Sequence, residues 1–134
     1  MNDLRPTRSA LWGTFFLLAT GLGTFSVFSA PEQKERAVSA LEQAVQTDSA
    51  NDELWLHLGF AYRKVGQMDQ AQKAFEKAAA LNPRSQDASY MLGLIYESKH
   101  QDQDALRAWQ QLLSSTNDPA KRETATNHIH HLSQ

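Results

Sequence analysis

The side chains best suited to chemistry in this chain are its 5 histidines and the acidic residues near them. His128 and His131 are one helical turn apart, and Glu53 and His57 have an i, i+4 spacing, so each pair could offer two metal ligands on one helix face. A closed zinc site takes about four ligands, and no third or fourth ligand can be placed beside either pair. The sequence therefore predicts surface histidines and no metal site.

Motifs of catalysis are missing from the sequence. It has no G-x-S-x-G, H-E-x-x-H or P-loop pattern, and no cysteine that could act as a nucleophile, form a disulfide or attach haem. The 13 Lys and Arg and 15 Asp and Glu leave a formal net charge of −2, without a basic stripe or a zinc-finger spacing. We therefore expect no enzyme activity, no cofactor, no small-molecule substrate and no nucleic-acid partner.

The elements that position these side chains are helices. Apolar residues recur at helical spacing in the neighbouring segments 52–65 and 68–81. Asn51 or Asp52 can cap the first helix, and Gly66 supplies a left-handed stop after it. The two segments are therefore predicted to form a helix–turn–helix hairpin.

The hairpin has eight landmark residues: Trp55, Leu58, Gly59, Tyr62, Ala71, Phe75, Ala78 and Pro83. In type and spacing they resemble the tetratricopeptide repeat (TPR), a helix–turn–helix unit of 34 residues. The resemblance implies a stacked helical solenoid that binds other proteins and carries no chemistry of its own.

A second unit follows 34 residues later, where the landmarks recur as Leu92, Gly93, Tyr96, Ala105 and Trp109. This unit departs from the pattern at Ser89, His100, Leu112 and Asn117. One repeat earlier, only the second helix is recognisable, through Ala37, Leu41 and Ala44. Residues 119–132 begin with Pro119 and have one apolar stripe, as in the capping helix that ends a repeat array.

We therefore expect an all-α fold, a short TPR-type helical solenoid in residues 31–134. It has a leading half repeat, two full helix–turn–helix repeats (52–85 and 86–119) and a capping helix (119–132). The expected helices are 31–47, 52–65, 68–81, 86–99, 102–115 and 119–132.

A short polar tail, residues 1–8, precedes residues 9–30, which carry no charge. As a helix the uncharged segment is about 33 Å long, enough to cross a bilayer core of roughly 30 Å. A cleaved signal peptide and an uncleaved signal anchor both fit. The length of the apolar run, and bulky Phe28 near the cleavage position, favour a transmembrane signal-anchor helix.

The flanking charges, two basic residues on each side of the segment, specify its orientation only weakly. The short N-terminal tail and the early position of the segment resemble a bacterial-type anchor. We expect a single-pass protein of the plasma membrane, with the TPR domain on the outer (periplasmic or luminal) side.

In TPR proteins the first helix of each unit lines the partner-binding groove. On this chain the resemblance implies six groove residues: Leu56, Phe60, Arg63, Tyr90, Leu94 and Glu97. Leu56 and Phe60 stand where the family's carboxylate clamp would want Lys and Asn, so an apolar or amphipathic partner segment is favoured over a C-terminal carboxylate. The alternative is that these residues pack on helix 31–47 or on the end of the anchor.

The functional expectation is a membrane-anchored protein–protein interaction module, an adaptor or assembly factor for a membrane or envelope complex. The alternative is a permanent accessory or structural subunit of a large membrane protein complex. The analogy holds at the level of the fold, and the sequence names no partner.

Overall fold

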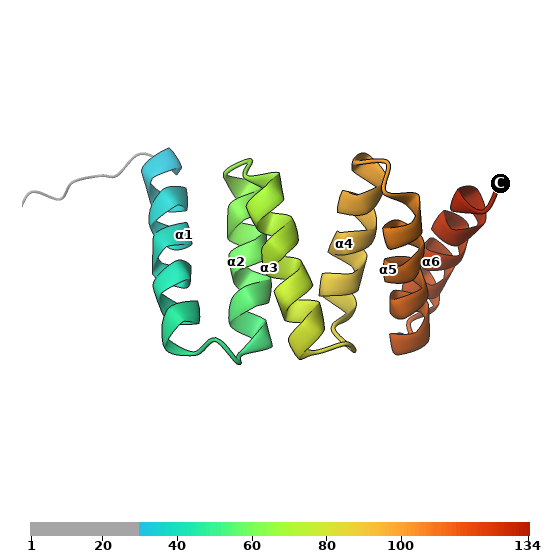
Figure 1. Ribbon diagram of the computed structural model, residues 1–134, viewed down its shortest axis with the longest axis horizontal. Coiled ribbons are helices and arrows are strands. Elements are labelled where there is room, and N and C mark those ends of the chain that lie inside the picture. Colours follow the sequence, from blue (N-terminus) through green and yellow to red (C-terminus); the bar gives the residue numbers. More distant parts are fainter. Residues whose placement is uncertain (1–29) are drawn as a thin grey trace, which may run out of the picture.

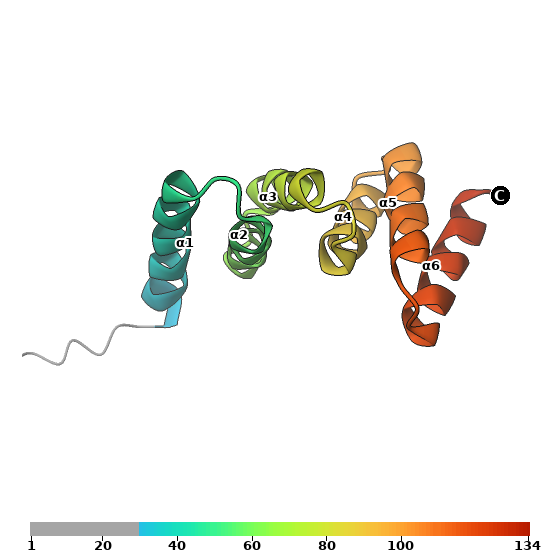
Figure 2. The same ribbon diagram turned by 90° about the horizontal axis from the view of Figure 1, so that it is seen from below.

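The computed structural model describes residues 30–134, and this part of the chain forms six α-helices joined by short loops (Figure 1). They are α1 (Ala30–Thr47), α2 (Asp52–Lys64), α3 (Met68–Leu81), α4 (Gln86–Ser98), α5 (Asp102–Ser115) and α6 (Pro119–Leu132). Each helix packs against the next one along the chain, so the helices form a row (Figures 1 and 2). The expected all-α helical solenoid is confirmed.

Side-chain caps begin three of these helices where the sequence offers an Asn, Ser or Asp. Asn51 Oδ1 accepts a hydrogen bond from the backbone N–H of Leu54 at 3.3 Å at the start of α2. Asp118 Oδ1 accepts from Ala120 N at 2.9 Å at the start of α6, and Ser85 caps α4 in the same way. Such a cap satisfies one of the free N–H groups of the first turn, which stabilises the helix by about 1 kcal/mol.

The turns inside the two repeats share one geometry. Gly66, between α2 and α3, has a φ of 80°, and His100, between α4 and α5, has a φ of 57°. In both turns the N–H after this residue donates to the carbonyl of the repeat's tyrosine, from Gln67 to Tyr62 and from Gln101 to Tyr96, at 2.9 Å each. This bond closes a left-handed helix end, which favours glycine. His100 adopts the conformation at some backbone cost.

Glycine brings the two helices of each repeat close together. A Cβ atom at Gly59 would lie 2.6 Å from the Phe75 ring, and one at Gly93 would lie 2.5 Å from the Trp109 ring. Both distances are far below van der Waals contact, so a larger residue would force the helices apart. The aromatic residue of α3 or α5 thus packs directly on the backbone of the preceding helix.

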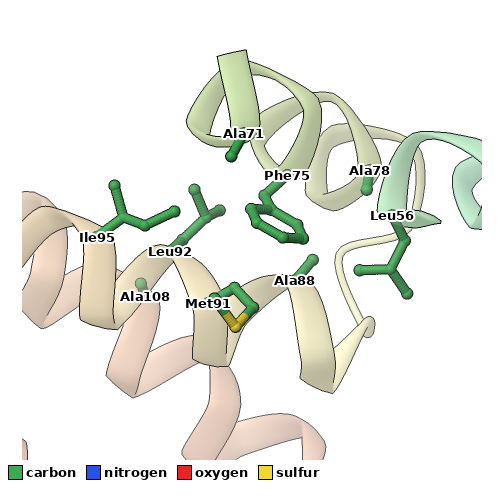
Figure 3. Packing of buried hydrophobic residues seen from close by; sticks show 9 residues of the cluster. All are labelled: Leu56, Ala71, Phe75, Ala78, Ala88, Met91, Leu92, Ile95 and Ala108. Carbon is green, nitrogen blue, oxygen red and sulfur yellow. The ribbon is translucent and has the colours of Figure 1, made fainter. Parts of the chain in front are cut away.

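The central hydrophobic core joins the two repeats (Figure 3). It contains Leu56 of α2, three residues of α3, four of α4 and Ala108 of α5. Phe75 of α3 points towards Leu92 of α4 and has no exposed surface. Smaller clusters extend this core to α1 on one side and to α6 on the other.

The contact between α1 and α2 repeats the contact between α3 and α4. Tyr62 of α2 donates its hydroxyl to Glu42 of α1 at 2.5 Å, and Tyr96 of α4 donates to Glu76 of α3 at 2.8 Å. Both pairs are 20 residues apart, and the pairs themselves are one 34-residue repeat apart. Burial and the glutamate raise the pKa of Tyr62 to about 12, and the same causes raise the pKa of Tyr96. Helix α1 therefore occupies the place of a repeat's second helix.

The transmembrane segment expected at residues 9–30 lies outside the described residues, except for Ala30, where α1 begins. Between residues 30 and 134 no helix combines the length and the apolar character needed to cross a bilayer.

Candidate functional site

The residues expected to bind a partner in the first repeat have three different environments. Leu56 is only 7% exposed, because it packs in the core with Ala88 and Met91 of α4. Phe60 is half-buried, with its ring edge-on to Phe75 at a centroid distance of 5.1 Å. Arg63 is exposed, and its guanidinium carbon lies 5.8 Å from the Phe60 ring centroid, a cation–π distance. Phe60 and Arg63 form one accessible unit, and Leu56 holds α2 against α4.

In the second repeat, α6 packs over part of the expected surface. Glu97 Oε1 accepts a hydrogen bond from Trp109 Nε1 at 2.6 Å and lies 2.8 Å from His128 Nδ1. Leu94 is half-buried against the cluster that joins α5 and α6. Tyr90 remains accessible, 37% exposed, with its ring edge-on to Trp109 at 5.5 Å. That α6 covers this face was not predicted from the sequence. The two residues that stack there, Trp109 and His128 of α6, were recognised in the sequence only as a repeat landmark and as a possible metal ligand.

His128 has a packing role. Its ring stacks on Trp109 at a centroid distance of 4.2 Å, and its Nδ1 faces Glu97. His131, its neighbour one turn away, is exposed. Within residues 30–134 no three His, Asp or Glu side chains lie close enough together to hold a metal ion.

An apolar hollow lies between α1 and α2, a cleft of about 440 Å³ that we call the α1–α2 cleft. Its walls are Gln33, Lys34, Ala37 and Leu41 of α1 and His57, Phe60, Ala61 and Lys64 of α2. Phe60, expected in the groove, thus forms part of this cleft.

A second hollow, of about 290 Å³, lies near the start of α2, α4 and α6 and is mainly polar. Glu53, Arg84, Asp87 and Lys121 contribute charges of both signs. Lys121 Nζ lies 3.7 Å from Asp87 Oδ1 and donates to Gln86 Oε1 at 3.0 Å, so these charges are partly paired within the chain. This hollow is less suited to an apolar partner than the α1–α2 cleft.

The arrangement of paired helices in a row, each packed on the next, defines a helical-repeat domain in residues 30–134. Two family models, both described as tetratricopeptide repeat, match residues 32–76 and 58–120. The chain carries TPR repeats. Domains of this type are typically non-enzymatic scaffolds.

Several curated proteins are similar to this chain over short stretches. Anaphase-promoting complex subunit 3 of Schizosaccharomyces pombe is 33% identical over 69 residues, 52% of this chain and 10% of that protein. The cell division cycle protein 27 homolog of Caenorhabditis elegans is 33% identical over 79 residues, 59% and 10% of the two chains. The human Superkiller complex protein 3 is 29% identical over 86 residues, 64% and 6%. This chain therefore matches a tenth or less of the length of these relatives.

Solved structures share the fold. The TPR domain of Arabidopsis OM64 superposes with a TM-score of 0.64 at 18% identity, over 75% of this chain and 83% of that one. The first TPR domain of Spaghetti (RPAP3), bound to the HSP90 peptide SRMEEVD, has a TM-score of 0.64 at 19% identity, over 77% and 79%. At these identities the likeness concerns the fold alone.

Proposed function

We propose that this protein is a membrane-anchored interaction module that holds a client protein beside a bilayer, as an adaptor or assembly factor for a membrane or envelope complex. The repeat domain supplies the binding surface, and the uncharged residues 9–30 supply the anchor. Similar proteins support the first half of the proposal: two relatives are named after multiprotein complexes, and the Spaghetti domain was solved with a bound peptide.

The observation that carries the proposal is the accessible aromatic surface on the first helix of each repeat. Phe60 with Arg63 above its ring, and Tyr90 at 37% exposure, are the kinds of side chain that dominate binding at protein interfaces. Because Leu56 and Phe60 stand where a carboxylate clamp would need Lys and Asn, the client presents an apolar or amphipathic segment.

The binding test replaces both aromatic residues with acids. In native membranes, photo-cross-linking followed by mass spectrometry identifies the client captured by the full chain. Phe60→Glu with Tyr90→Glu should abolish this capture, because the interface would then have to bury two charges. The matched control, Gln70→Glu with Gln110→Glu, adds the same charge at exposed positions of α3 and α5 and should leave capture intact. Capture by the aromatic double variant with unchanged helicity would refute this surface.

The proposed location is a single-pass plasma-membrane protein with the repeats on the outer side. It rests on the uncharged residues 9–30, which are long enough to span a bilayer core and have basic residues on both sides. A C-terminal reporter that is active on only one side of the membrane tests the orientation. Activity of a cytoplasmic reporter would reverse it, and release of the repeat domain in soluble form would replace the anchor with a cleaved signal peptide.

The second candidate function is a permanent accessory subunit. The open α1–α2 cleft favours it, because a fixed partner would keep that apolar surface covered. Co-purification separates the two functions: a subunit keeps a fixed stoichiometry that resists salt, and an assembly factor is substoichiometric.

A further inference from the structure

The α1–α2 cleft has an equivalent place one repeat later, beside α3, and that place is occupied by α2. Ala37 and Leu41, on its α1 wall, are equivalent to Ala71 and Phe75 of α3. Both α3 residues have no exposed surface: the Phe75 ring lies against Gly59 of α2, and both residues pack in the central core with Leu56 of α2 and with α4. Ala37 is exposed and Leu41 is half-buried. No helix between residues 30 and 134 packs on α1 as α2 packs on α3.

The α2 wall of the cleft leads to the same conclusion. His57 and Ala61 are equivalent to Met91 and Ile95 of α4. His57 is exposed where Met91 is 6% exposed, whereas Ala61 is already buried, at 9% against 2% for Ile95. Leu56 of α2 belongs to the same cluster as these two α4 residues and lies near Ala78 and Ala88 (Figure 3). The walls of the α1–α2 cleft therefore match those of the place that a repeat's first helix occupies, and none of the helices of residues 30–134 fills this place.

The described backbone does not make the turn that would lead into such a helix. Gly66 and His100 take the left-handed conformation that reverses the chain between the two helices of a repeat. Their equivalent one repeat earlier, Glu32, lies inside α1. For this reason α1 has 18 residues, against 14 in α3 and in α5. The hairpin of the two complete repeats is thus not formed at this end.

The charged residues that line the cleft have one sign. Lys34 and Lys64 are exposed on its two walls, and His57 lies beside them. Arg63 adds a further cation at the C-terminal end of α2. None of the residues that line the cleft is acidic. A complementary occupant carries carboxylates at its edges.

We propose that the α1–α2 cleft binds an amphipathic helix of a partner protein, which takes the place that a repeat's first helix would have beside α1, packs its apolar face on Leu41 and Phe60, and directs acidic side chains to Lys34 and Lys64. The proposal rests on the protein-binding function proposed above and makes it specific. The bound helix has the length of α2, 13 residues.

The test uses the full chain in detergent micelles and two labelled synthetic helices. Both peptides have the same leucine stripe; one has Glu and the other Lys along its flanks. The acidic peptide should bind better to the wild type, and Lys34→Glu with Lys64→Glu should reverse that preference. Ala37→Glu should weaken binding of the acidic peptide by about tenfold or more, because it places a carboxylate in the cleft. The control pair Gln70→Glu and Gln110→Glu should change nothing.

Equal binding of both peptides, or loss of binding in the control pair, would overturn the proposal. A photo-cross-linker at position 37 in native membranes checks the occupant. Cross-links to an acidic helix of another protein support it, whereas cross-links to residues 9–29 of the same chain or to a second copy overturn it. If Tyr90→Glu prevented capture of a client and Ala37→Glu did not, the proposed function would stand. The client would then bind elsewhere than in the α1–α2 cleft. Absence of any capture would remove both.

Discussion

The two ends of the solenoid have related sequences and different surroundings. At the C-terminal end, α5 buries Ala105, Trp109 and Leu112 completely. The equivalents in α1 at the N-terminal end are Ala37, Leu41 and Ala44. These residues are exposed or half-buried. The apolar stripe on the second helix of a repeat is therefore buried only where other helices pack on it. The stripe by itself does not determine how far it is buried.

The C-terminal end is closed because α6 is tied to it at several points. Arg122 Nη1 donates to the carbonyls of Leu113 and Thr116 at 3.0 and 3.1 Å, at the C-terminal end of α5. Ala125 is completely buried against α5, while much of the remaining surface of α6 is polar. A cap of this kind ends the apolar core of a repeat array. The N-terminal end keeps its core accessible in the α1–α2 cleft.

The largest expected effect comes from placing the same charge at equivalent alanines. Ala71→Glu should destabilise the fold by about 5 kcal/mol, because the carboxylate would be buried without a partner. Ala37→Glu should change the free energy of unfolding by less than about 0.5 kcal/mol, because Ala37 is exposed. Urea unfolding followed by circular dichroism measures both. Similar losses in the two variants would mean that the N-terminal end is also closed.

Truncation of equivalent large residues is the next test of the two ends. Trp109→Ala should cost about 3–5 kcal/mol, since it empties a fully buried site and removes the partner of Glu97 and His128. Leu41→Ala should cost about 1 kcal/mol, because the side chain is only half-buried. Thermal melts of the two variants rank these losses. A Leu41→Ala loss as large as that of Trp109→Ala would contradict the difference.

A smaller effect tests the tyrosine–glutamate hydrogen bond that the α1–α2 and α3–α4 interfaces share. Tyr62→Phe and Tyr96→Phe each remove one hydrogen bond to a glutamate and should each cost about 1 kcal/mol. The folded-state pKa of Tyr62, about 12, lies above the ordinary value of about 10. The stabilisation is therefore complete below pH of about 10 and is lost as the pH rises towards about 12.

Unfolding measured across this pH range should show a shallower decline in Tyr62→Phe than in the wild type, because the variant has no phenol to ionise at this position. Ultraviolet titration of the remaining tyrosines provides the control. If the stability of the wild type and of Tyr62→Phe declined in parallel, ionisation of Tyr62 would not affect the fold. The α1–α2 contact would then differ from its counterpart between α3 and α4.

The smallest effect concerns a polar contact that only one of the two interfaces has. Lys99 Nζ lies 2.6 Å from both Asp69 Oδ1 and Gln72 Oε1, and the pairing holds the pKa of Asp69 below its usual value. The equivalents of Lys99 and Gln72 at the N-terminal end are Val65 and Val38, which pack together in an apolar cluster.

Lys99→Met should lower the melting temperature slightly at low salt and not at high salt, because exposed ion pairs are screened. Val65→Ala should lower it equally at both salt concentrations. A salt-dependent effect of Val65→Ala would show that the two interfaces do not differ in this way.

Most of the fold could be predicted from the sequence because its signals are local. Asn51 caps α2, and Gly66 takes the left-handed turn after it, both as expected. The helix bounds differ from those predicted by one residue at the start of α1 and at the ends of α2 and α4. Caps and turns depend on neighbouring residues, so they are readable without knowledge of packing.

The candidate site was less predictable, since exposure is not a local property. Leu56 is equivalent to Tyr90 in the repeat, yet the structure buries Leu56 against α4 and leaves Tyr90 accessible. Leu94 packs in the cluster of α5 and α6. Glu97 was expected at the rim of a groove and instead contacts Trp109 and His128. That this face binds a partner stays a prediction.

By itself the sequence determined the class of the protein, its repeat length, its helices and their caps, because helical periodicity and turn chemistry are encoded within a few residues of each other. Only the tertiary structure decided which apolar faces are covered. Ala71 and Ala37 sit at the same position of the repeat, and one is fully buried while the other is exposed. The physical reason is that an apolar surface is buried only when a second surface packs on it. Among the helices of residues 30–134, none packs on α1 as α2 packs on α3.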